Sequence, residues 1–137
     1  MSTSTIELTV NDVLLPVSKI AAVKPKTLFK EVLEAMTKAR IGIACVVADD
    51  GSLAGIITDG DIRRMLLKDQ KPFSYLFADD AIVHANPKCT TVKPSDLLRD
   101  AVQIMEDRQI WDLPVVDDRG KLAGLLHLHP AIKALLG

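Results

Sequence analysis

The stretch that decides the fold is residues 46–55, Val46-Val47-Ala48-Asp49-Asp50-Gly51-Ser52-Leu53-Ala54-Gly55, which recurs 69 positions later as residues 115–124, Val115-Val116-Asp117-Asp118-Arg119-Gly120-Lys121-Leu122-Ala123-Gly124. In both copies an apolar run ends in acidic residues and a glycine, and a second apolar run follows, which is the pattern of a β-hairpin. The self-match continues without a gap over residues 21–68 and 90–137. A repeat of this length indicates two copies of one supersecondary unit.

Each copy predicts five elements in the order β-α-β-β-α. In the first copy we expect strands at 20–23, 43–47 and 53–58, with helices that open at Lys26 or Thr27 and at Ile62. In the second copy we expect strands at 90–92, 113–116 and 122–128, with helices that open at Ser95 and at Ala131. Leu28, Val32 and Met36 recur at four-residue spacing, which is typical of a helix with one apolar face. Because three short strands and two helices leave one face of a sheet bare, we expect the copies to pack about a pseudo-twofold axis and share a core.

This organisation divides the chain into four segments that form one compact pair. Residues 1–8 are a tail, disordered or added to the protein; residues 9–68 are the first repeat, 69–88 a linker and 89–137 the second repeat. Within the linker, residues 75–77 are expected to pack as a short turn of helix.

The composition excludes several classes of partner. The 137 residues carry a net charge of −1, from 17 basic and 18 acidic side chains, and 48% of them are apolar. Such a chain can bury a core but has no basic stripe for a nucleic-acid backbone. No apolar run approaches the ~20 residues that span a bilayer, and the polar start of the chain is not a signal peptide. We therefore expect a cytoplasmic protein with no nucleic-acid or membrane partner, in which Cys45 and Cys89 are buried thiols.

The order of elements, the hydrophobic-hydrophobic-Asp-x-x-Gly-x-Leu-x-Gly hairpin and the Thr58-Asp59-x-Asp61 helix start together resemble a tandem pair of CBS domains, an α+β fold, from about Val10 onward. More narrowly, residues 55–64 and 124–129 resemble the C-terminal CBS pair of bacterial arabinose-5-phosphate isomerases, enzymes of the pathway to 3-deoxy-D-manno-octulosonate (Kdo), a lipopolysaccharide sugar. In that family an N-terminal sugar-isomerase domain carries the catalysis, and the parent enzyme is expected to be a tetramer. Nothing in this sequence resembles that domain, so the chain should not be an enzyme and is either an excised regulatory piece or a stand-alone protein.

Residues 58–64 form the first candidate binding stretch, because they follow a strand and open a helix. Free backbone N–H groups and the helix dipole at such a start suit a phosphate. Thr58 can donate and accept a hydrogen bond, and Arg63 or Arg64 could pair with phosphate or carboxylate oxygens. The resemblance implies that Asp61 accepts both hydroxyls of a ribose. The alternative is an ordinary helix start, with Asp59 as the N-cap and both arginines in solvent.

The second copy departs from this pattern. Thr58 corresponds to His127 and Asp61 to Pro130, which suits the first helical position and has no side-chain acceptor. The second site is therefore either empty or holds a ligand through His127 and His129. Those two histidines could also be a proton- or anion-binding pair, a hydrogen-bonded structural pair or, with His84, metal ligands; without a visible third ligand we predict no metal site.

The resemblance also implies which residues line the ligand clefts: Ile20, Ala21, Ile41, Gly42, Ile43 and Ala44 in the first copy, and Cys89, Thr90, Ile110, Trp111, Asp112 and Leu113 in the second. Gly42 would let a ligand approach the backbone closely. Trp111 could stack on a base, or it could fill an interface with a second copy or with an attached enzyme domain.

The function predicted from the resemblance is regulation by a small ligand, a nucleotide or a nucleotide-activated sugar such as CMP-Kdo, with no cofactor. A homodimer is expected as well, because CBS pairs commonly dimerise face to face. Two alternatives remain open at this stage. The pair could be a purely structural dimerisation module, or it could be the regulatory CBS pair of a sugar nucleotidyltransferase.

Overall fold

The computed structural model describes residues 7–137, so that residues 1–6 of the predicted tail lie outside the described part. The first copy contains β2 (Ala21–Val23), α1 (Phe29–Ala39), β3 (Ile43–Val47), β4 (Leu53–Thr58) and α2 (Asp59–Lys68). The second copy contains α5 (Leu98–Arg108), β5 (Asp112–Val116), β6 (Leu122–His127) and α6 (Leu128–Leu136). The predicted strand at 90–92 is reduced to a single bridge, in which Val92 pairs with Val115.

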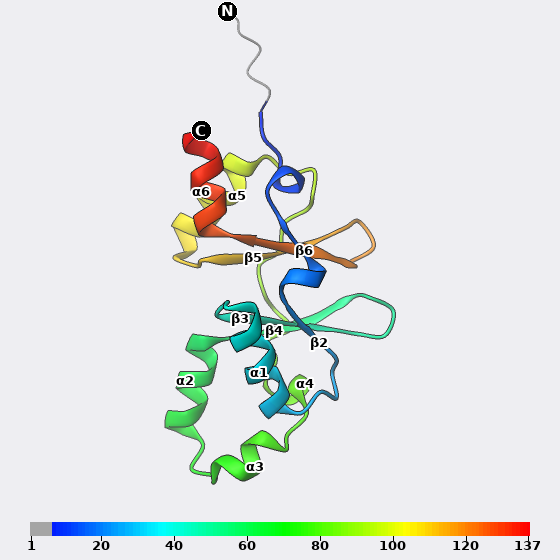
Figure 1. Cartoon of the computed structure of the whole chain (residues 1–137), viewed down its shortest axis with the longest axis vertical. Coiled ribbons are helices and arrows are strands. Elements are labelled where there is room, and N and C mark those ends of the chain that lie inside the picture. The colour runs from blue at the N-terminus through cyan, green and yellow to red at the C-terminus, as the bar shows by residue number, and fades with distance from the viewer. Residues whose placement is uncertain (1–6) are drawn as a thin grey trace, which may run out of the picture.

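The two copies have the same strand register as well as the same sequence pattern. In the first sheet β2 runs parallel to β3, which pairs antiparallel with β4 so that Cys45 lies opposite Ile56. In the second sheet Pro114 lies opposite Leu125, at positions 69 residues further on. The two sheets face each other at the centre of the molecule, and the helices of each copy lie on the outer sides (Figure 1). The predicted α+β pair is therefore confirmed.

The segments that precede each copy cross over and pair with the sheet of the other copy. The short strand β1 (Leu15–Pro16) pairs with β6, and the 3₁₀ helices η1 (Val10–Asp12) and η2 (Val17–Lys19) flank it. Asn86, from the linker, pairs in the same way with Ile56 of β4. A Cβ atom on Gly55 would lie 2.9 Å from the Asn86 carbonyl oxygen, so this glycine allows the crossing segment to approach. Gly124 does the same for Leu15.

The linker packs on the first copy through two short helices, α3 (Phe73–Phe77) and α4 (Ala81–His84). Leu76 and Ala81 are buried there. The predicted helical turn at 75–77 lies within α3 and is confirmed. In the part of the chain that the structure describes, no helix is long and apolar enough to cross a bilayer.

A core shared by both copies fills the space between the sheets. Ile43 and Cys45 of β3 pack there against Leu125 of β6, and Ile56 and Leu122 surround them. Burial of one such aliphatic side chain contributes about 1.5–3 kcal/mol. The hairpin tips add two backbone bonds, from Leu53 N–H to the Gly120 carbonyl oxygen (3.1 Å) and from Leu122 N–H to that of Gly51 (3.0 Å). The predicted shared core is confirmed, and the tips hold the two copies together at one end.

The helix starts differ from those predicted. Helices α1 and α5 begin at Phe29 and Leu98, later than expected, because a side chain at or next to each expected start closes a preceding turn instead. Thr27 Oγ1 accepts a hydrogen bond from the Lys24 N–H (2.9 Å), and Asp96 Oδ2 accepts one from the Lys93 N–H (2.9 Å).

Helices α2 and α6, in contrast, follow directly on their strands and begin three residues earlier than expected, at Asp59 rather than Ile62 and at Leu128 rather than Ala131. Pro130 is therefore the third residue of α6 and not the first. Both corrections matter for the site, because they move the helix N-caps onto the last residues of β4 and β6.

Candidate functional site

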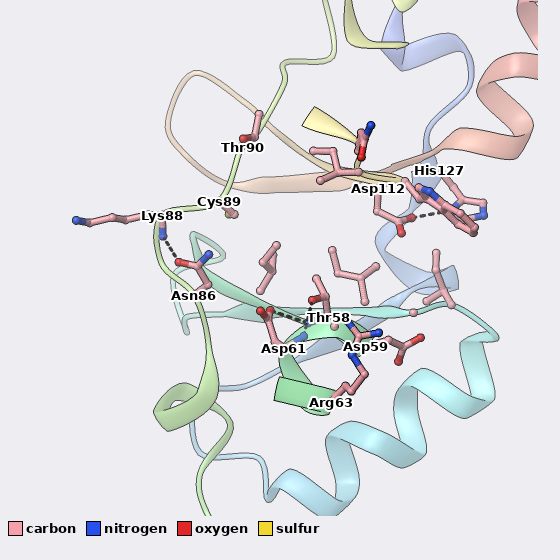
Figure 2. A pocket seen from close by; sticks show the side chains of 18 of the residues that line it. Thr58, Asp59, Asp61, Arg63, Asn86, Lys88, Cys89, Thr90, Asp112 and His127 are labelled. Atoms are coloured by element: carbon pink, nitrogen blue, oxygen red, sulfur yellow. Dashed lines mark hydrogen bonds and ion pairs between the residues drawn. The ribbon is translucent and has the colours of Figure 1, made fainter. Parts of the chain in front are cut away.

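A cleft of about 870 Å³ lies between the two copies, where the start of β3 and the end of β4 face the corresponding ends of β5 and β6. Figure 2 shows Thr58, Asp59 and Asp61 on one wall and Asp112 and His127 on the other. The lining residues are Arg40, Ile41, Gly42, Ile43, Ile56, Thr58, Asp59, Gly60, Asp61, Arg63, Asn86, Lys88, Cys89, Thr90, Gln109, Ile110, Trp111, Asp112 and His127. Its size is typical of a small-molecule site.

The first-copy wall is built around a capping box at the start of α2. Thr58 is the N-cap, and its Oγ1 accepts from the Asp61 N–H (3.1 Å), while Asp61 Oδ2 accepts from the Thr58 N–H (3.1 Å). The expectation that Asp59 is the N-cap is wrong, because the helix begins one residue earlier than that role requires. Thr58 and Asp61 fix each other, so both side chains are held in place at the cleft.

Asp61 is anionic and oriented. Its Oδ1 accepts a hydrogen bond from the Arg64 guanidinium (2.8 Å). Burial opposes ionisation, but the hydrogen bonds from Arg64 and Thr58 outweigh it and hold the pKa of Asp61 below its ordinary value. Two bonds leave part of the acceptor capacity of the carboxylate free for a ligand.

Gly42 makes room for a neighbouring carboxylate. A Cβ atom at this position would lie 2.6 Å from Asp59 Oδ2. The Asp59 N–H also donates to the Gly42 carbonyl oxygen (3.0 Å). The close approach that was expected from a ligand is therefore made by Asp59 of the protein itself.

The second-copy wall carries a polar pair. His127 Nδ1 lies 2.7 Å from Asp112 Oδ1, on the adjacent strand. Burial raises the pKa of Asp112 although the hydrogen bond and the electrostatic interaction with His127 lower it, and the negative charge of Asp59 raises it further. Trp111 precedes Asp112 and is 69% exposed, so its indole is accessible at the edge of this wall.

The two cysteines do not provide a nucleophile. Cys45 is buried in the shared core, and burial, with smaller contributions from Cys89 and Asp112, raises the pKa of its thiol to about 12. Cys89 lines the cleft and is only half-buried, which corrects the expectation that both thiols are buried; burial still raises its pKa. Since the thiolate is the reactive form, neither group is activated.

The structure brings most of the predicted site residues to the cleft. Thr58, Asp59, Asp61, Arg63, Ile41, Gly42, Ile43, Cys89, Thr90, Ile110, Trp111, Asp112 and His127 line it. Leu113 is buried in the core of the second copy instead. Ala21 and Ala44 point instead into the core beneath helix α1, because alternate residues of a strand face opposite sides of the sheet. Ile20 packs beside the shared core, and Arg64 folds back onto Asp61.

The two histidines two residues apart do not face the cleft together. His127 ends β6, whereas His129 lies in the first turn of α6, is exposed and is outside the lining. His84 hydrogen-bonds to Asp79 (2.9 Å) and packs against the Phe29 ring in the first copy, tilted by 57° at a centroid distance of 4.9 Å. Within residues 7–137 no group of three His, Cys, Asp or Glu side chains is placed to hold a metal ion.

Several lining residues were missing from the predicted site: Arg40, Ile56, Asn86, Lys88 and Gln109. One of them had a signal in the sequence. The glycine repeated at 55 and 124 marks where another segment, here Asn86, approaches the strand closely.

Comparison with known proteins defines the class. The family model described as "CBS domain" matches residues 10–68 and 80–137, so the chain belongs to the CBS-domain family and contains two such domains. It is 29% identical to CBSX2 of Arabidopsis thaliana, whose crystal structure in complex with AMP superposes with a TM-score of 0.80 over 93% of this chain and 96% of that one.

Two curated relatives are longer proteins. The chain is 37% identical over 122 residues, 88% of its length, to a Helicobacter pylori protein described as uncharacterized, of which it covers 35%. It is 35% identical over 99 residues, 72% of its length, to the arabinose 5-phosphate isomerase KdsD of Pseudomonas aeruginosa, of which it covers 29%. The chain thus spans about a third of the length of these relatives.

Proposed function

We propose that this CBS pair is the regulatory ligand-binding module of an arabinose-5-phosphate isomerase of Kdo biosynthesis, and that it senses a nucleotide or a nucleotide-activated sugar such as CMP-Kdo. The similarity to KdsD supports the choice of parent enzyme. The complex of CBSX2 with AMP supports a nucleotide as the class of ligand. The observation that carries the proposal is the oriented, anionic Asp61 in an open cleft beside a helix start.

The first-copy wall can hold the ribose phosphate of such a ligand. The free acceptor positions of Asp61 suit the two hydroxyls of a ribose. The Asp59 and Asp61 N–H groups are already bonded to Gly42 and Thr58, but the positive end of the α2 dipole and Arg63, which lines the cleft, favour an anionic phosphate there. Arg40 and Lys88 add positive charge from neighbouring segments.

Regulation would follow from the position of the cleft. A ligand in the cleft contacts both copies, so its binding stabilises the relative position of the two copies in which both walls contact it. An attached enzyme domain is biased only if its active and inactive states differ in that arrangement.

The test is calorimetric titration of the chain with CMP-Kdo, AMP and ATP, together with the melting temperature at saturating ligand. We expect at least one of these ligands to bind and to raise the melting temperature, since a ligand that binds only the folded state stabilises it. The absence of binding to all three, with an unchanged melting temperature, would contradict the proposal.

A dimerisation role is favoured by a separate observation. Leu67 of α2 and Leu136 of α6 occupy equivalent positions and are 79% and 83% exposed. Exposed apolar residues at matching places on both copies suit a face-to-face homodimer. Light scattering coupled to size exclusion tests this role: a dimer that Leu67→Ser with Leu136→Ser converts to monomer supports it, and a monomeric wild type contradicts it.

A further inference from the structure

The Asp112–His127 pair stands where the first copy has Ile43 and Thr58. Both are cross-strand neighbours in the same register, Asp112 opposite His127 and Ile43 opposite Thr58. The Asp112 side chain is only 13% exposed and that of His127 31%. Apolar residues of similar volume often stabilise a fold as well as a buried ionic pair does, so stability alone does not account for this pair.

His127 is available for this pair because α6 does not use it as a cap. His127 is the N-cap residue, yet its side chain makes no capping hydrogen bond. The third helical residue is Pro130, which has no N–H for a cap to satisfy. In the first copy, the equivalent Asp61 N–H binds Thr58.

The pair leaves hydrogen-bond acceptors for a ligand. With Asp112 ionised, His127 Nδ1–H donates to its Oδ1, and a neutral imidazole then has Nε2 as an acceptor. Asp112 Oδ2 is a second acceptor and makes no hydrogen bond to the described residues. The arginines and the lysine of the cleft come from the first copy and the linker, so the second-copy wall is the acceptor-rich end.

We propose that Asp112 and His127 determine the specificity of the cleft by selecting a nucleobase that carries an exocyclic amino group. This inference rests on the proposed nucleotide function. An exocyclic amino group donates hydrogen bonds to the acceptors of the pair, Asp112 Oδ2 and His127 Nε2. A carbonyl oxygen at the same place is itself an acceptor, so it would be repelled by the lone pairs of the Asp112 carboxylate. The phosphate then points to the first-copy wall and Arg63, and Trp111 is exposed beside the base.

The test compares nucleotides that differ in this group, AMP with IMP and CMP with UMP, by calorimetric titration at pH 7.5. The informative variant is Asp112→Ile with His127→Thr, because it rebuilds the pair that the first copy already accommodates in the same register. The matched control is Asp79→Asn, which alters the other Asp–His pair, outside the cleft lining. Melting curves show that each variant is folded.

We expect the wild type and the control to prefer the amino-bearing member of each pair by about tenfold or more, and the double variant to lose this preference while it still binds both members. Equal affinities within both pairs for the wild type, or an unchanged preference in the double variant, would overturn the inference and leave the nucleotide function standing. A wild type that binds none of the four nucleotides would overturn the inference, and silence with CMP-Kdo and ATP as well would overturn the nucleotide function too.

Discussion

The two ends of the cleft share a backbone but not a chemistry. In the first copy an apolar residue and a hydroxyl, Ile43 and Thr58, face each other across the hairpin; in the second copy a carboxylate and an imidazole do so. The same register places all four side chains at the cleft. The comparison shows that a duplicated unit can keep its hydrogen-bond ladder while its two binding walls diverge.

The difference between the copies at Asp61 and Pro130 permits the difference at Thr58 and His127. Thr58 is committed to capping α2, because the Asp61 N–H requires an acceptor. In α6 a proline replaces that N–H, so the N-cap side chain can bond to Asp112. Pro130 therefore leaves the His127 side chain free to bond to Asp112.

The largest effect on stability is expected when Ile43 is replaced by aspartate, the residue at the equivalent position 112 of the second copy, without the histidine that accompanies it there. Ile43 is 2% exposed, and Thr58 cannot neutralise a carboxylate there. Ile43→Asp should lower the free energy of unfolding in urea by about 3–5 kcal/mol, the cost of an uncompensated buried charge. Adding Thr58→His should restore part of the loss. An Ile43→Asp variant as stable as the wild type would show that the two walls are interchangeable.

The next effect concerns ligand affinity. Asp61→Ala should weaken the binding of the nucleotide that the wild type binds best by about 1.5–3 kcal/mol, since a charge-assisted hydrogen bond is lost. Pro130→Ala, at the equivalent position, should change the affinity little because proline offers no acceptor. Calorimetric titration measures both. Equal losses would contradict the assignment of the ribose to the first copy.

A smaller effect is expected from the helix cap. Thr58→Ala should lower the free energy of unfolding by about 1 kcal/mol, because the Asp61 N–H loses its acceptor. Thr58→Ser keeps the hydroxyl and should behave like the wild type. Chemical denaturation of the three proteins distinguishes a cap from a residue that acts only on the ligand.

The smallest effect is a difference between Asp61 and Asp112 in how each changes the free energy of unfolding from pH 5 to pH 3. The pKa of Asp61 is lowered by folding, so its contribution to stability is present above the ordinary value of about 3.9 and is lost as the pH falls through the folded pKa. The pKa of Asp112 is raised, so its ionised form is disfavoured in the fold and acidification through that pKa favours folding.

Denaturation at a series of pH values measures this difference. Relative to Asp61→Asn, the wild type should lose stability on acidification; relative to Asp112→Asn, it should gain. The same sign for both carboxyls would contradict the electrostatic difference between the walls.

The sequence was sufficient to predict the hairpins, the repeat and the shared core, because a period of 69 residues fixes the same register twice. It did not indicate that β1 and Asn86 cross to the other copy, since pairing by one or two residues has no periodicity. Only the repeated glycines, Gly55 and Gly124, carried that information. The helix starts were misplaced because several capping residues stand within a few positions of each other.

The candidate site was predicted less completely than the fold. The Thr58–Asp61 motif located the first-copy wall from local sequence alone. The resemblance placed Asp112 at the cleft, but Lys88 joins the cleft only through the crossing of the linker. Residues contributed by a distant segment leave no local pattern in the sequence.

The most direct test of the difference between the two walls is a crystal structure of the chain soaked with AMP and CMP-Kdo. We predict ligand density in the cleft, with the ribose hydroxyls within hydrogen-bond distance of the Asp61 carboxylate and the phosphate beside Arg63. A ligand whose ribose lies at Pro130, or a cleft that holds only solvent at millimolar nucleotide, would contradict this account.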